Sequence, residues 1–431
     1  MEIENNASKP KILVFMIIMV LAGSGSTITI KILQSIDAKN SGFYHPWFCT
    51  FIMFIGELLC LIPYFIFNAN SNKKVEKKRT INSGKGSSYN SHSSRSQSLV
   101  GKSDGTEIVK PELSVFWVII PALFDMCGST LLFLGLTNMA SSVYQMLRGS
   151  VILFIALGSI KLLKRRLFRH NWLGMILVLI GLLLVGIGYI YDIHNKEKDA
   201  QTSPWGVIMV IASCIFTAGL FICEELLMTK YKCHPLKLVG LEGLWGVIIY
   251  LVFLFLAYYI PCPVSDKDFD LRKGVCAKND NDEWVLENIY FAVKQMDPTG
   301  DDSDPRVLVL ILLYLIIIPI FNSVGVWITK NVSATARSII DTIRTLIVWI
   351  VFLTVPVAMS IREYFDSIQL VGFIFCICGN IIYHEVLILP FWGLNKNTKE
   401  ELRKEITEGV IQEEVVKDQM TQKLIDSWKH L

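Results

Sequence analysis

Ten long apolar runs constrain the fold of this 431-residue chain more than any other feature of its sequence. A helix needs roughly 20 mostly apolar residues to cross the hydrocarbon core of a bilayer. Its backbone polar groups are then all paired within the segment, as the absence of water requires. The sequence therefore predicts an all-α polytopic membrane protein with ten transmembrane helices, over residues 11–33, 46–68, 114–137, 141–162, 171–191, 204–228, 237–260, 306–328, 333–358 and 367–389.

The composition agrees with a lipid-facing exterior. Charged residues make up 18% of the chain, where soluble proteins have roughly 25%. The formal net charge of +3 gives no reason to expect a nucleic-acid partner. The lipid bilayer and a small-molecule solute are the expected partners, and a homodimer is compatible with the sequence.

Positive charges indicate the orientation of the spans. They gather in the loops after the second, fourth and sixth runs, at Lys73, Lys74, Lys77, Lys78, Arg79, Lys161, Lys164, Arg165, Arg166, Arg169, Lys230, Lys232 and Lys237. These loops lie on one side of the membrane, and cytoplasmic loops are the ones enriched in Lys and Arg. Both termini are then expected in the cytosol.

The expected domain organisation follows from the spans. Segment 69–112 is rich in Ser, Lys, Asn and Gly and has too few apolar residues to fold alone. The parts are a cytosolic N-terminus (1–10), a first five-helix repeat (11–191, with 69–112 as a disordered cytosolic loop), a luminal linker (192–203), a second five-helix repeat (204–390, with 261–305 as a luminal loop) and a cytosolic tail (391–431).

The two halves share an internal repeat at an offset of 196 to 198 residues. Phe124-Asp125-x-x-Gly128 recurs as Phe321-Asn322-x-x-Gly325, and Gln145-x-x-Arg148 recurs as Asp341-x-x-Arg344. Gly174 and Gly181 recur as Gly372 and Gly379. Because five spans is an odd number, the second copy enters the membrane from the opposite side. Such inverted repeats are typical of secondary transporters, whose solute site lies near the midplane between the repeats.

Charged residues within the fourth and ninth spans mark the candidate site. Arg148 and Arg344 can face a central cavity and bind an anionic solute, or Asp341 can neutralise Arg344 in a purely structural role, with Asp125 as the partner of Arg148. The predicted solute-binding residues are Tyr144, Gln145, Arg148, Asp341, Arg344, Asp125 and Asn322.

Other acidic residues in the spans have two readings. Glu57 and Glu242 occupy matching spans, and either can carry a coupled proton, since burial favours the neutral form of a carboxyl group, or serve as a structural acid. Glu224 and Glu225 are expected at the cytosolic interface, close to Lys230.

Most of the ten cysteines lie within apolar runs and are expected to be small buried side chains. Cys262 and Cys276 differ, because they flank a polar stretch on the non-cytosolic side. An oxidising lumen would allow a disulfide between them, although the sequence alone leaves the pair open.

Several motifs resemble the F-type branch of solute carrier family 35, in the drug/metabolite transporter superfamily. They read PALFDMCGS, SSVYQMLRGSVILF, HNWLGM, CEELL, HPLKLVGLEGLWG, YYIP and FNSVGVWITKNVSATARSIIDTIRTLIVW. The resemblance implies inverted repeats, an endomembrane location such as lysosome, vacuole or Golgi, and alternating access without ATP. A broader similarity is to nucleotide-sugar carriers and chloroquine-resistance-type transporters. Segment 69–112 and the Cys-bearing loop depart from the branch.

These observations predict a secondary transporter of a small solute, with a central cavity between the repeats. The alternative is a non-transporting scaffold that acts through its cytosolic loop and tail. An enzyme is not expected, because the loops contain no nucleophile–base constellation, no metal-ligand spacing and no glycine-rich phosphate loop. The sequence predicts no cofactor and no metal.

Overall fold

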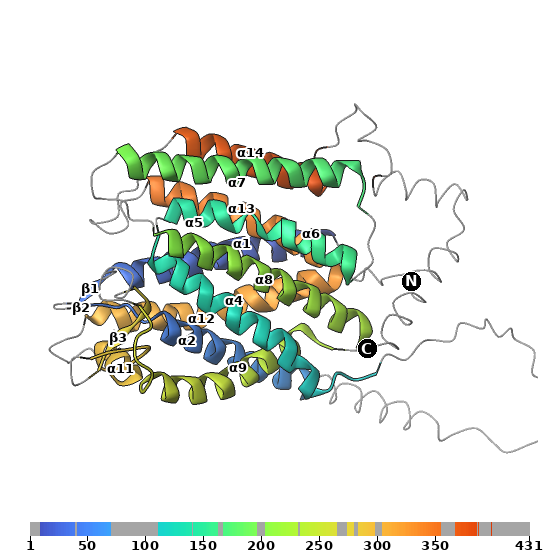
Figure 1. Cartoon of the computed structure of the whole chain (residues 1–431). Coiled ribbons are helices and arrows are strands. Elements are labelled where there is room, and N and C mark those ends of the chain that lie inside the picture. The colour runs from blue at the N-terminus through green and yellow to red at the C-terminus, as the bar shows by residue number, and fades with distance from the viewer. Residues whose placement is uncertain are drawn as a thin grey trace, which may run out of the picture.

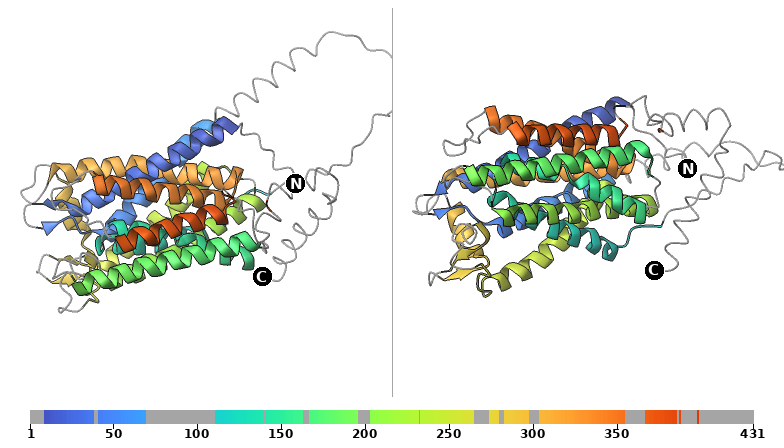
Figure 2. Two further views of the ribbon diagram at one scale, coloured as in Figure 1. Left: turned by 90° about the horizontal axis from the view of Figure 1, so that it is seen from above. Right: turned by 45° about the horizontal axis from the view of Figure 1, so that its top comes forward.

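The structure is a computed structural model in which helices lie side by side (Figures 1 and 2). It describes residues 9–38, 41–69, 111–139, 141–162, 167–195, 203–231, 233–264, 274–279, 283–297, 304–354, 367–385, 387 and 398. Most of segment 69–112, the loop residues 163–166 and nearly all of the tail 391–431 lie outside these ranges, so the predictions for them stay predictions.

Eight helical segments within the described ranges are long and apolar enough to cross a membrane. They are Pro10–Gln34, Pro46–Ala69, Val115–Thr137, Val143–Lys161, Arg169–Gly188, Pro204–Lys230, Pro235–Ala257 and Pro305–Asn331. The chain is therefore an all-helical membrane protein, with eight candidate spans where the sequence predicts ten.

The two remaining predicted spans are also helices, α13 (Ala334–Thr354) and α14 (Ser367–Tyr383). Helix α13 carries three charged residues, more than an apolar membrane span usually contains. Helix α14 is only 17 residues long. The difference in count thus comes from buried charge in one helix and short length in the other.

The other helices in chain order are α1 (Lys9–Ser35), α2 (Pro46–Leu59), continued by helical residues 61–69, the 3₁₀ helix η1 (Val115–Val118), α4 (Ile119–Thr137), α5 (Ser141–Arg148), α6 (Val151–Lys161), α7 (Arg169–Asn195), α8 (Pro204–Lys230), α9 (Pro235–Ala257), α11 (Ile289–Met296) and α12 (Pro305–Asn331). Proline begins α2, α8, α9 and α12, where its missing N–H costs nothing and its φ suits the first turn. Helix α7 extends to Asn195, four residues into the predicted linker 192–203.

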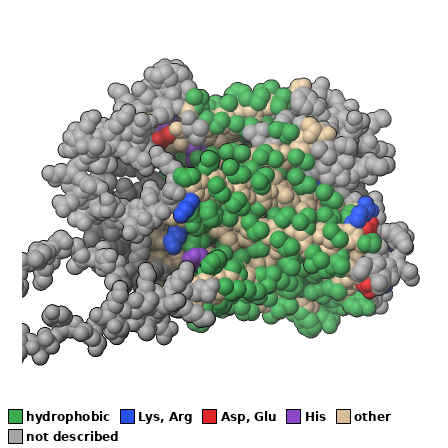
Figure 3. Space-filling view, turned by 180° about the vertical axis from the view of Figure 1, so that it is seen from behind, with side chains coloured by type: hydrophobic (Ala, Val, Ile, Leu, Met, Phe, Trp, Pro, Cys, Tyr) green, Lys and Arg blue, Asp and Glu red, His purple; other side chains and the backbone are tan. Residues whose placement is uncertain are grey.

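Four pairs of neighbouring helices dominate the packing: α7 with α14, α4 with α8, α1 with α12, and α2 with α9. Large apolar side chains such as Leu183, Phe255 and Ile316 point outward. Figure 3 shows the resulting broad hydrophobic surface, with Lys and Arg toward its ends. An apolar surface of this extent on the outside of a protein is what a bilayer covers.

Short strands and α11 lie together at one end of the molecule, called the strand end below (Figure 1). Strands β1 (Asp37–Ala38) and β2 (Ser41–Gly42) form one antiparallel pair, and β3 (Ala277–Lys278) and β4 (Trp284–Val285) form another. The opposite end, where α8 finishes at Lys230 and α12 at Asn331, is called the basic end, because Lys161, Arg169 and Lys330 also lie there.

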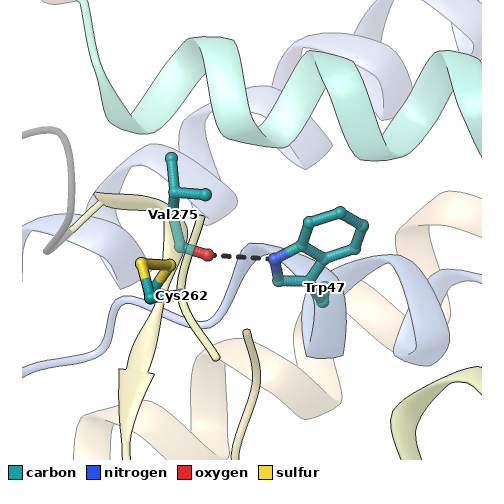
Figure 4. The surroundings of a disulfide bond; sticks show 4 residues. Trp47, Cys262 and Val275 are labelled. Carbon is teal, nitrogen blue, oxygen red and sulfur yellow. Dashed lines mark hydrogen bonds between the residues drawn. A yellow bond between two sulfur atoms is a disulfide. The ribbon is translucent and has the colours of Figure 1, made fainter. Parts of the chain in front are cut away.

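A disulfide joins Cys262 and Cys276 at the strand end, with their Cα atoms 5.9 Å apart. The indole N–H of Trp47 donates to the carbonyl oxygen of Val275 at 3.0 Å (Figure 4). Near the start of α2, Nδ1 of His45 lies 2.6 Å from Oε1 of Glu287, and both side chains are buried. The disulfide loop is therefore attached directly to the N-terminal end of α2.

The four glycines of the repeat lie at a single crossing of α7 and α14. A Cβ added to Gly174 would lie 2.6 Å from the carbonyl oxygen of Gly379, and one added to Gly181 would lie 2.5 Å from that of Gly372. Lipid gives helices no hydrophobic reason to associate, so close backbone approach through small residues supplies the packing energy.

We expect Gly174→Ala to lower the thermal unfolding midpoint of the purified, detergent-solubilised protein, measured by intrinsic fluorescence. Overpacking costs about 1–3 kcal/mol, which outweighs the roughly 0.5–1 kcal/mol that Ala gains over Gly inside a helix. Gly186→Ala in the same helix is the control, because no atom outside the local helix backbone lies within 4 Å of a Cβ placed there. Equal midpoints for the two variants would contradict this account of the crossing.

Candidate functional site

A cavity of about 80 Å³ lies among the membrane helices. This volume holds several water molecules, since one water needs about 10–15 Å³ on the same measure. The residues that line it include Ser26, Thr27, Asp125, Ser129, Tyr144, Arg148, Thr217, Phe221, Tyr314, Phe321, Asn322, Arg337 and Arg344. Five of the predicted solute-binding residues are thus at one cavity.

Asp341 connects the two arginines that the sequence predicts for the site. Its Oδ2 accepts a hydrogen bond from Nη2 of Arg148 at 3.1 Å, and its Oδ1 lies 2.9 Å from Nη2 of Arg344. All three residues are largely buried. One carboxylate between two guanidinium groups leaves one net positive charge in this trio.

Arg148 occupies the last residue of α5, just before an interruption of the predicted fourth span. The N–H groups of Gly149 and Ser150 donate to carbonyls three residues earlier, so a tight turn separates α5 from α6. A cation is favourable at the C-terminal end of a helix. Nη1 of Arg148 also donates to the hydroxyl of Tyr144 at 3.2 Å.

Arg344 is held by α1 as well as by Asp341. Its Nη1 lies 3.4 Å from the carbonyl oxygen of Gly23 and 3.3 Å from Oγ1 of Thr27. A Cβ on Gly23 would lie 2.3 Å from Cδ of Arg344, so only glycine leaves room for this side chain. The guanidinium group also lies 5.1 Å from the ring centroid of Phe321.

Of the carboxyl groups predicted for the spans, Asp125 lines the cavity, and Glu57 lies next to it through the cavity residue Asn322. Nδ2 of Asn322 donates to Oε1 of Glu57, and Oγ of Ser129 donates to Oδ1 of Asp125 at 2.8 Å. Asp125 is therefore not the partner of Arg148, a role that Asp341 takes. Glu242 is buried as well.

Gln145 is buried but is not among the residues that line the cavity. Its repeat counterpart is Asp341, which forms the two ion pairs. The two halves therefore differ at this position, with a neutral amide in one and the bridging carboxylate in the other.

Arg337 is a cavity residue that the sequence analysis does not predict. It is 2% exposed, forms an ion pair with Glu224, and places its guanidinium carbon 4.0 Å from the ring centroid of Phe221. The side chain of Glu224 is also 2% exposed, and its expected place at the cytosolic interface stays a prediction. The signal was present, since Arg337, Asp341 and Arg344 have the i, i+4, i+7 spacing of one helix face.

We expect Asp341→Asn to destabilise the protein by about 3–5 kcal/mol, because it leaves two buried guanidinium groups without their carboxylate. The double variant Asp341→Asn with Arg344→Met removes one cation as well and should recover part of the loss. Thermal unfolding midpoints and the yield of monodisperse protein measure both effects. A single variant as stable as the unmodified chain would show that the ion pairs are dispensable.

The fold and this site together define a polytopic helical membrane protein with buried charges around an internal cavity. The family comparison is more specific. The model of the CRT-like family, described as chloroquine-resistance transporter-like, matches residues 99–383, and the chain belongs to that family.

Individual relatives confirm the resemblance to solute carrier family 35. Solute carrier family 35 member F6 from Rattus norvegicus and from Homo sapiens are each 27% identical over 373 residues, which cover 85% of this chain and 87% of the relative. The UDP-N-acetylglucosamine transporter of Homo sapiens is 26% identical over 151 residues, covering 33% of this chain and 46% of that protein.

Proposed function

We propose that this protein is a secondary transporter that moves a small anionic solute across an endomembrane by alternating access, without a cofactor and without enzymatic activity. It is built from ten helices in two inverted five-helix repeats. The observation that carries the proposal is the cavity at which Arg148 and Arg344, from equivalent helices of the two halves, share one carboxylate.

The helix packing supports the inverted repeat. In the repeat, α1 corresponds to α8 and α12 corresponds to α4. Exchanging the halves therefore turns the pair α1 with α12 into the pair α8 with α4, and both pairs pack closely. The helices α2 and α9 are repeat counterparts that pack on each other, as are α7 and α14, so the exchange leaves these two pairs unchanged. A packing pattern that survives this exchange is expected of two copies related by an axis in the membrane plane.

The positions related by the repeat also support a central solute site. Asp125 and Asn322 are repeat counterparts, as are Arg148 and Arg344, and all four line the same cavity. A midplane site between repeats is the arrangement of secondary transporters. Because the cavity holds only a few water molecules, a metabolite enters it only when the surrounding helices move apart.

The net positive charge of Arg148, Asp341 and Arg344 favours an anionic solute. A solute carboxylate or phosphate can replace Asp341 as the partner of Arg148, which is the more exposed of the two arginines. Similarity to a transporter of UDP-N-acetylglucosamine, which is an anion, agrees with this choice. Glu57 and Glu242 are the candidates for proton coupling.

The basic end is proposed to face the cytosol. The described residues Lys161, Arg169, Lys230 and Lys330 lie near the membrane there, as the positive-inside rule requires. The disulfide between Cys262 and Cys276 at the opposite end suits an oxidising lumen. Both termini would then be cytosolic, and the lysosome, vacuole and Golgi are the candidate compartments.

Uptake into liposomes that contain the purified full-length protein tests the function. The panel comprises nucleotide sugars, carboxylates, amino acids, peptides and organic cations. We expect saturable uptake of an anion, and a loss of about tenfold or more in Arg148→Gln, because a hydrogen bond to a charged group contributes about 1.5–3 kcal/mol. Arg148→Lys should retain part of the uptake, and Arg306→Gln at an exposed position is the control.

Unchanged uptake in both Arg148→Gln and Arg344→Gln would overturn the anion site. The alternative, a non-transporting scaffold, predicts the opposite pattern. In that case, deletion of residues 69–112 or 396–431 abolishes the cellular function, and variants of the cavity do not.

A further inference from the structure

Two groups of membrane helices surround the cavity. Helices α1, α12 and α13 pack on one another and are called the first bundle. Helices α4, α5 and α6 each pack against α8, and these four are called the second bundle. Between the bundles, α5 packs against α13 and α8 against α12, whereas α1 and α4 contact each other only over a short stretch, and so do α8 and α13. These two weak contacts lie at opposite ends of the cavity.

At the basic end, α8 of the second bundle holds the first turn of α13. Glu224 forms an ion pair with Arg337, and Oε2 of Glu225 accepts a hydrogen bond from the backbone N–H of Ala334 at 3.3 Å. A carboxylate is favourable at the N-terminal end of a helix. We call these four residues the basic-end clasp.

At the strand end, α1 of the first bundle holds the C-terminal end of α4. Nζ of Lys31 donates to the carbonyl oxygens of Leu136 and Met139, each at 3.0 Å, and the side chain of Lys31 is buried. A cation is favourable at the C-terminal carbonyls of a helix. We call these three residues the strand-end clasp.

Each clasp continues the cavity-lining face of its helix by one turn. On α8, Leu220 and Phe221 line the cavity, and Glu224 and Glu225 follow at i+4. On α1, Thr27 lines the cavity, and Lys31 follows at i+4. Because α1 and α8 run in opposite directions, the next turn leads toward the strand end on α1 and toward the basic end on α8 (Figure 1).

We propose that the two clasps are the gates of the cavity. Glu224 with Arg337 closes the basic end, Lys31 closes the strand end, and the two open in alternation as the first and second bundles rock against each other. Charged contacts suit this role because they join two helix pairs, α1 with α4 and α8 with α13, that share few other contacts. The assignment rests on the proposed alternating-access mechanism.

The test measures access to the cavity from each side, without any solute. Thr217→Cys places a reporter thiol at the cavity wall of the full chain, and a membrane-impermeant maleimide is applied to sealed vesicles of each orientation. The same chain without the reporter gives the background from the native cysteines. An epitope tag before residue 1 shows which vesicle face carries the basic end, because α1 begins there.

We expect Glu224→Gln to raise the labelling rate from the basic-end side by about tenfold, with no rise from the other side. Lys31→Met should raise it from the strand-end side alone. Arg337→Lys and the exchanged pair Glu224→Arg with Arg337→Glu keep the attraction and should bring labelling back toward that of the reporter chain. Lys330→Met, a cation at the basic end outside the clasp, is the matched control and should change nothing.

Equal increases from both sides, or no increase in either variant, would overturn the proposal, since loosened packing has no preferred side. If Glu224→Gln does not fold, the labelling rates of Arg337→Lys and of the exchanged pair decide the question. Both variants keep the attraction between opposite charges, so a gate made by that attraction should stay closed in both. One-sided access together with no uptake of any solute would retain the gates and reject transport. Uptake together with two-sided access would reject the gates alone.

Discussion

The carboxylate of Asp341, held between Arg148 and Arg344, is the interaction on which the interior of this protein depends. An ionised side chain at the centre of a membrane helix costs roughly 2.5–3.5 kcal/mol on insertion scales, and here three of them meet. Their mutual attraction makes the arrangement tolerable, and it draws α5 and α13 from the two halves of the chain to one point. The proposed preference for an anionic solute rests on the one positive charge that this trio retains.

The bilayer imposes the second constraint, because it removes the hydrophobic reason for helices to associate. The chain meets it with close backbone contacts where α7 crosses α14, through Gly174, Gly181, Gly372 and Gly379. The backbones approach closely at that crossing, whereas the contacts of α1 with α4 and of α8 with α13 include the charged side chains of Lys31, Glu224 and Arg337. The proposed alternating access needs both kinds of contact, close packing in one place and charged contacts that can break in another.

Much of the architecture could be predicted from the sequence, because lipid allows few solutions. The lengths of the apolar runs predict the helices to within a few residues, and family membership agrees with the motifs. The interruption at Gly149 and Ser150 was not predicted, since it depends on hydrogen bonds within a turn that apolar periodicity does not report. The ion pair of Glu224 was not predicted, because its partner Arg337 is over a hundred residues away in the sequence.

The sequence by itself determined that this chain lies in a membrane, which runs form helices, and which polar residues within them demand an explanation. A polar residue within an apolar span stands out in the sequence however the helices are packed. Only the tertiary structure decided the pairings: Asp341 rather than Asp125 with Arg148, Asn322 with Glu57, and Lys31 with the end of α4. The reason is physical, because an ion pair depends on distances between helices, and these are set by side-chain packing that spacing along the chain does not contain.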